Sequence, residues 1–200
     1  MSYILSYCEK ILPFALIFSL IYIGVRGLTV RKDTTLAREG SLFLFYLFLV
    51  AILSQTLTLD GSIYSISFSA PELSRETVNI IPFKVFSRLS KMSGEDFRYF
   101  LTVNILGNIL LFLPLGFLHR LTMCRRLWQS ALFGLILSGS IEIIQICIPP
   151  RATDIDDIIL NFFGVALGAA LASLLLRYEK LKLGRFQKTQ QGASAKSTAN

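Results

Sequence analysis

The sequence has 200 residues, of which 53% are hydrophobic and 16% are charged, and its formal net charge is +7. Soluble domains carry about 25% charged residues, and the apolar residues here lie in blocks too long for the core of so small a soluble protein. The composition therefore argues against a soluble enzyme, a disordered chain or a disulfide scaffold, and it predicts an integral membrane protein.

Five apolar stretches approach the roughly 20 residues that a helix needs to cross a hydrocarbon core about 30 Å thick. They are residues 11–25, 40–59, 99–118, 128–148 and 158–176. We expect all of them to be helices, because lipid offers no hydrogen-bond partner to an open backbone. Of the 20 basic and 13 acidic residues, only Glu142 falls within these stretches. The predicted fold is an all-α integral membrane bundle of about five transmembrane helices with a long extracytoplasmic loop.

The distribution of lysine and arginine predicts the orientation of the helices, because short cytoplasmic loops are enriched in both. The loops after the first and third apolar stretches, together with the C-terminal segment, hold 13 basic residues, and the opposite side holds 7. We therefore expect a multi-pass cell-membrane protein with its N-terminus outside and its C-terminus cytoplasmic. Anionic lipid at the inner surface accounts for the net charge, so we expect no nucleic-acid partner.

The pattern divides the chain into four parts. Residues 1–60 are predicted to form two N-terminal transmembrane helices, and residues 61–98 an extracytoplasmic loop. Alternating apolar and polar residues at 64–69 predict a short extended segment in that loop. Residues 99–183 are predicted to form a three-helix core. The polar residues 184–200 lack an apolar pattern, and we expect them to form a disordered cytoplasmic tail.

Polar residues gather at the predicted outer ends of the last three helices. Glu142 and Gln145 share a helix face because they lie three residues apart. Residues at steps of three and four form a second face, along the last helix. That face carries Asp154, Asp157, Asn161, Gly164 and Gly168. Asn79, Asn104 and Asn108 fall at the same side, and Arg151 in the connecting loop is the candidate partner of Glu142.

Structural roles can explain part of this pattern. Thr153 or Asp154 can cap the last helix, and Asp156 is expected to cap it or to be solvated. The side-chain amides of Asn104, Asn108 and Gln145 can form hydrogen bonds between helices, and glycines let a neighbouring helix approach closely. Glu142 can form a structural ion pair with Arg151. These readings stand beside the prediction of a functional site.

Three sequence blocks resemble the VanZ-like family of membrane proteins, which is named after an accessory protein of glycopeptide-resistance gene clusters. The first two blocks are Asn79-Ile-Ile-Pro-Phe83 and Asn108-Ile-Leu-Leu-Phe-Leu-Pro-Leu-Gly116. The third is Glu142-Ile-Ile-Gln145 with Ala152-Thr-Asp-Ile-Asp-Asp157, Asn161, Gly164 and Gly168. The third block is specific, because a membrane acid, an amide and a Thr-Asp-x-x-Asp-x-x-x-Asn run rarely coincide by chance.

The resemblance implies a protein of the cell envelope linked to low-level teicoplanin resistance, through altered access of the drug to the cell surface. It assigns no catalytic residue. The sequence differs from the family's named member in its polar C-terminal tail, which stands in place of a final hydrophobic segment.

Two function classes remain open. A non-catalytic envelope factor would bind membrane lipids, a lipid-linked cell-wall precursor or a glycopeptide at its outer surface. An intramembrane enzyme would act on a lipid-linked substrate with Glu142, Asp157 or Asp154 as general acid or base. Candidate substrate-binding residues are Arg151, Gln145, Asn161, Asn108, Asn104 and Asn79.

No cofactor and no resident metal are expected. Asp154, Asp157 and Glu142 nevertheless offer the oxygen ligands that magnesium or manganese prefers, so a divalent cation remains an alternative. A transporter ranks last, because the inner halves of the predicted helices are almost purely apolar and mark no path across the bilayer.

Overall fold

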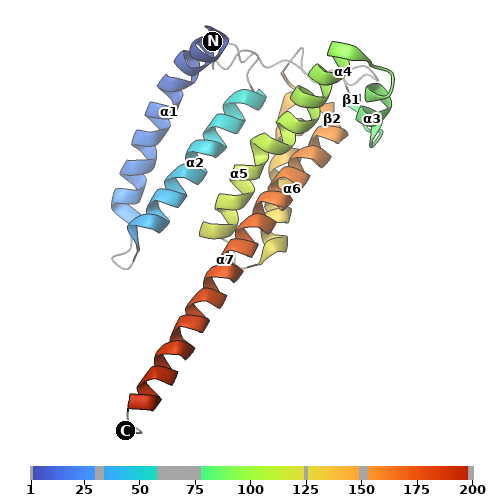
Figure 1. The fold of residues 1–200 in the computed structure, drawn as a ribbon. Coiled ribbons are helices and arrows are strands. Elements are labelled where there is room, and N and C mark those ends of the chain that lie inside the picture. Colours follow the sequence, from blue (N-terminus) through green and yellow to red (C-terminus); the bar gives the residue numbers. More distant parts are fainter. Residues whose placement is uncertain (1, 30–33, 58–77, 124–125, 149–152, 198–200) are drawn as a thin grey trace.

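The computed structural model describes residues 2–29, 34–57, 78–123, 126–148 and 153–197, and these residues are mostly helical (Figure 1). The elements in chain order are α1 Ser2–Thr29, α2 Leu36–Leu57, β1 Val78–Asn79, α3 Lys84–Leu89, α4 Gly94–Phe100, the π-helical segment η2 Leu101–Leu106, α5 Gly107–Thr122, α6 Leu127–Gln145, β2 Thr153–Asp154 and α7 Ile155–Ser197. α5, α6 and α7 pack together, and α2 lies between them and α1 (Figure 1).

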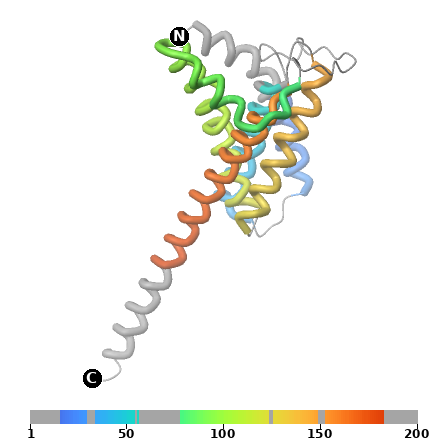
Figure 2. Tube along the Cα trace, turned by 90° about the vertical axis from the view of Figure 1, so that its right-hand side faces the viewer, coloured from blue at the N-terminus to red at the C-terminus, as the bar shows by residue number. Residues whose placement is uncertain are grey.

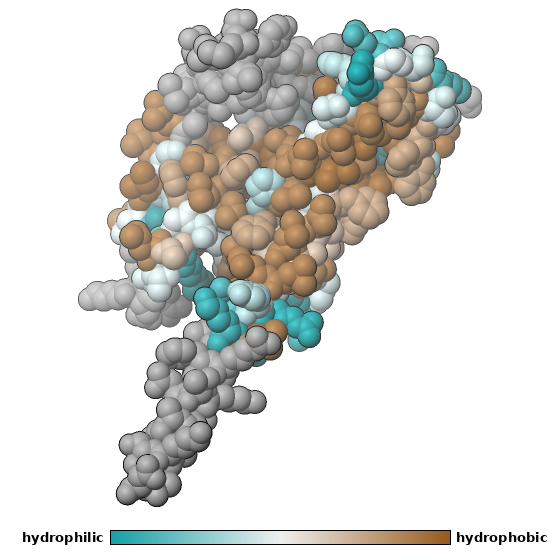
Figure 3. Space-filling view, viewed as in Figure 1, coloured by the Kyte–Doolittle hydropathy of each residue, from teal (hydrophilic) through white to brown (hydrophobic). Residues whose placement is uncertain are grey.

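Four helical segments among the described residues are long and apolar enough to cross a membrane. They are Leu36–Ser54, Gly94–Thr122, Leu127–Gln145 and Ile155–Lys182. The fifth predicted span falls on α1, where the apolar part with described side chains, Leu16–Thr29, is shorter. Apolar side chains cover the middle of the molecule, while polar ones gather toward its two ends (Figure 3). The protein is therefore an all-helical, multi-pass membrane protein with four candidate spans and a shorter apolar N-terminal helix.

The core of the bundle joins α2, α5, α6 and α7. It consists of buried apolar side chains: Phe45, Ile52, Phe112, Leu115, Leu118, Ile141 and Val165. α5 and α7 approach so closely that a Cβ at Gly168 would overlap the carbonyl oxygen of Leu113, and one at Gly164 would overlap that of Ile109. The sequence prediction that these two glycines allow close helix packing is confirmed.

The segment from β1 to α4 crosses one end of the bundle, near the start of α7 (Figure 2). Its α3 packs there through Val85, which is buried against Ile105 of η2 and Leu160 of α7. This part of the predicted extracytoplasmic loop is therefore packed on the bundle. η2 interrupts the predicted helix 99–118 with wider π-helical turns, which occur frequently at functional sites.

Two helix boundaries differ from the sequence expectation. α6 ends at Gln145, before the predicted boundary at 148. Cys147 and Ile148 instead donate hydrogen bonds to the carbonyl oxygens three residues back, which tightens the last turn before Pro149. α7 continues to Ser197, past the predicted boundary at 176. The predicted extended segment at 64–69 lies outside the described residues.

Candidate functional site

A short parallel sheet brings two distant parts of the chain together. Val78 of β1 pairs with Thr153 of β2, and Asn79 pairs with Asp154. The Asn79 side-chain amide Nδ2 also donates a 2.6 Å hydrogen bond to Oδ1 of Asp154. The first and third resemblance blocks therefore meet at one end of the bundle. Strands of this length carry no periodic signal, so the sequence alone did not predict the pairing.

Asp156 holds the turn between β1 and α3. Its carboxylate accepts hydrogen bonds from the backbone N–H of Phe83 and from that of Val85, the latter at 2.6 Å. Phe83 has a φ of 63°, a left-handed conformation that is costly for a bulky residue and needs such support. Asp156 is only 3% exposed. The sequence interpretation of a cap or a solvated acid missed this bond to a distant backbone.

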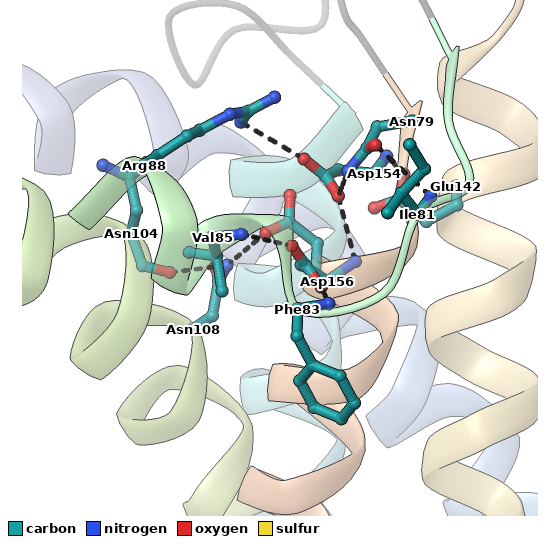
Figure 4. A network of polar contacts seen from close by, with 11 residues as sticks. Asn79, Ile81, Phe83, Val85, Arg88, Asn104, Asn108, Glu142, Asp154 and Asp156 are labelled. Atoms are coloured by element: carbon teal, nitrogen blue, oxygen red, sulfur yellow. Dashed lines mark hydrogen bonds and ion pairs between the residues drawn. The ribbon is translucent and has the colours of Figure 1, made fainter. Parts of the chain in front are cut away.

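Asp154 connects the sheet to α3 and to α7 (Figure 4). Its Oδ1 accepts hydrogen bonds from Asn79 and from the backbone N–H of Asp156, the latter at 3.0 Å. Its Oδ2 lies 3.4 Å from Nη1 of Arg88. The Arg88 side chain is 45% exposed, so this ion pair contributes little to stability. Both oxygens of Asp154 are therefore engaged within the protein.

Glu142 holds β2 against α6. Its Oε2 accepts a 2.9 Å hydrogen bond from the backbone N–H of Asp154, and its carbonyl oxygen accepts one of 3.1 Å from the Thr153 hydroxyl. Glu142 is 3% exposed. Its predicted partner Arg151 lies outside the described residues. Gln145, predicted to share its site, instead donates a 2.6 Å hydrogen bond to the carbonyl oxygen of Thr56 in α2.

Asp157 belongs to a different set of contacts. Its Oδ1 accepts a 2.8 Å hydrogen bond from Nδ2 of Asn108. The same Nδ2 donates a 3.1 Å hydrogen bond to the carbonyl oxygen of Asn104. Asn161 lies one turn farther into the bundle, where it donates a 2.9 Å hydrogen bond to the hydroxyl of Ser138 on α6. Asn161 therefore links α7 to α6 rather than joining Asp157.

A pocket of about 180 Å³ lies among these elements. Its charged lining residues are Lys84, Arg88, Asp154, Asp156 and Asp157, and its amides are Asn79 and Asn104. Within the described part of the chain, Lys84 makes no ion pair. The same residues contain no group of three or more His, Cys, Asp or Glu side chains that could hold a metal ion. The chemistry that this pocket offers is charge and hydrogen bonding.

The structure separates the predicted site residues into groups. Asn79, Asn104, Asp154 and Asp157 line the pocket, while Asn108 and Glu142 each bond to one of these. Gln145 and Asn161 bond to other helices, as described above. Sequence reasoning missed Lys84, Arg88 and Asp156. The one sequence signal for the two basic residues is their closeness to the Asn79–Phe83 block, which Lys84 follows directly and Arg88 four residues later.

Comparison with known families gives one finding for this chain. A family profile described as VanZ/LLP1 matches residues 43–176, a range that contains every pocket-lining residue. Comparison with curated proteins and with solved structures gives no significant match.

Proposed function

The chain belongs to the VanZ/LLP1 family, and we propose that it acts at the cell envelope by binding the polar headgroup of a membrane lipid or of a lipid-linked cell-wall precursor. The observation that carries this proposal is the position of the charged pocket at the end of an apolar helical bundle. A ligand there can leave its polar part among the charged side chains while its tails stay in the bilayer.

The size of the pocket favours a headgroup over a whole glycopeptide. Pockets that enclose drug-sized ligands measure roughly 300–1,000 Å³, and this one measures about 180 Å³. We infer that any decrease in teicoplanin susceptibility arises indirectly, through the lipid or lipid-linked molecule that the protein holds. The predicted cytoplasmic loops and the C-terminal segment hold most of the basic residues, and this distribution supports an outward-facing pocket.

An enzyme is the second candidate function, and the position of Asp157 favours it. Glu142, Asp154 and Asp156 each accept backbone hydrogen bonds, whereas Asp157 bonds to the Asn108 amide and lines the pocket. Asp157 is therefore the carboxylate best placed to act as general base on a bound headgroup, with Asn108 orienting it. Release of a product from a lipid-linked precursor by the purified protein would favour this function over simple binding.

The test of the proposal is glycopeptide susceptibility in a sensitive host. We expect the wild-type chain to raise teicoplanin tolerance and Asp157→Asn to abolish the increase at equal membrane levels. Asp96→Asn is the matched control, because Asp96 is an exposed acid of α4 that does not line the pocket. No change with the wild-type chain, or full tolerance with Asp157→Asn, would contradict the proposal.

A further inference from the structure

The charged groups of the pocket come from two sides. The bases Lys84 and Arg88 belong to α3, and the acids Asp154, Asp156 and Asp157 belong to β2 and to the first turn of α7. Both oxygens of Asp156 accept backbone hydrogen bonds, from Phe83 and from Val85. Arg88 is paired with Asp154. Lys84 makes no ion pair among the described residues, and Asp157 bonds to a neutral amide. One cation and one anion thus remain available to a ligand that carries both charges.

The same segment places apolar side chains beside the pocket. Ile80, Ile81, Phe83 and Phe86 are 74%, 62%, 58% and 51% exposed, respectively. The Phe83 ring points away from the polar network (Figure 4). The bonds from Asp156 to the Phe83 and Val85 backbone fix this arrangement. Four large apolar side chains next to a charged pocket match an amphipathic ligand, with polar and apolar parts in one molecule.

We propose that the pocket holds a zwitterionic phospholipid headgroup, in which a phosphate is joined to a primary amine. The phosphate lies at Lys84 and accepts from nitrogens of Arg88 other than the Nη1 that contacts Asp154. The ammonium donates to Asp157, and the acyl chains cover the exposed side chains of Ile80, Ile81, Phe83 and Phe86. Lysine binds phosphate as a point charge, arginine adds directed donors, and an ammonium group offers three donors to a carboxylate. This inference rests on the proposed function and names the ligand class of the same site.

Two properties of the pocket separate this ligand from simpler ones. An anionic headgroup without an amine would leave Asp157 facing a second negative charge with no new partner. A bare cation would leave Lys84 unpaired, and the described residues contain no group of three metal-ligating side chains. A phosphate linked to an amine satisfies both ends of the pocket at once.

The experiment measures which lipid the purified full-length protein retains. The protein is placed in nanodiscs of equimolar phosphatidylethanolamine and phosphatidylglycerol, released into detergent, and its bound lipid is measured by native mass spectrometry. We expect about tenfold preference for phosphatidylethanolamine, which is the effect of one charge-assisted hydrogen bond. Asp157→Asn removes the preference, and Lys84→Gln lowers retention of both lipids.

Matched variants control for general effects of charge. Asp96→Asn and Lys91→Gln change an acid and a lysine outside the pocket in the same way as Asp157→Asn and Lys84→Gln do within it. We expect both control variants to keep the wild-type preference for phosphatidylethanolamine. Equal retention of the two lipids by the wild-type protein overturns the inference, as does an unchanged preference in Asp157→Asn. If Lys84→Gln still lowers total retention in that case, headgroup binding at the pocket survives and only the zwitterionic ligand is wrong.

A soluble competitor distinguishes a lipid from a free phosphate compound. Glycerophosphoethanolamine carries the same phosphodiester and ammonium charges without acyl chains. We expect it to displace bound phosphatidylethanolamine only at far higher concentration, because it cannot cover the apolar residues beside the pocket. Displacement at equal concentration overturns the assignment to a lipid.

Discussion

Asp156 and Asp157 are neighbours in sequence with different roles in the structure. Asp156 accepts two backbone hydrogen bonds from the turn before α3, whereas Asp157 accepts a side-chain amide and lines the pocket. The sequence pattern places Asp157 on the polar face of the last helix, and the structure agrees. The sequence pattern could not assign the role of Asp156, because the partner of that carboxylate is a backbone turn more than 70 residues away.

This contrast predicts that two isosteric substitutions affect different properties, one the stability of the protein and the other its function. Asp156→Asn leaves one acceptor oxygen for two backbone N–H groups, of which that of Val85 is buried, and this costs about 1–3 kcal/mol of unfolding free energy. Asp157→Asn retains an oxygen that can accept from Asn108, so we expect near wild-type stability with loss of function. Thermal unfolding of both variants in one detergent checks this. Equal midpoints for Asp156→Asn and the wild type would contradict the role of Asp156.

At the scale of the elements, α5 and α7 form the contact that positions the pocket. The periodic apolar stretches and the spacing of Gly164 and Gly168 were sufficient to predict these helices and their close packing. They were not sufficient to predict β1, β2 or η2, or the helices α3 and α4 in the predicted loop. Strands of two residues, helices of six or seven and a local change of helical pitch depend on tertiary contacts. Of the missed elements, β1, α3 and β2 supply residues of the polar network.

Close packing gives a prediction for one glycine. In Gly168→Ala the new methyl group overlaps the Leu113 carbonyl, and such overpacking costs about 1–3 kcal/mol. We expect a lower midpoint of thermal unfolding in detergent. Gly139→Ala on α6 is the control, because a Cβ there meets no atom within 4 Å. A midpoint for Gly168→Ala as high as that of the control would show that α5 and α7 separate without cost.

In the molecule as a whole, the proposed function requires the pocket to face outward. The sequence supports this orientation through the distribution of lysine and arginine, which acts during membrane insertion and leaves no contact in the fold. For the same reason, the packing of the helices is compatible with either orientation.

We propose that the pocket faces the cell exterior and carries the function. The most direct test is Asn104→Cys in a chain without other cysteines, since Asn104 is an exposed, uncharged lining residue. We predict that a membrane-impermeant charged thiol reagent labels this cysteine in intact cells, and that labelling abolishes teicoplanin tolerance. Labelling only after permeabilisation, or complete labelling without loss of tolerance, would contradict the claim.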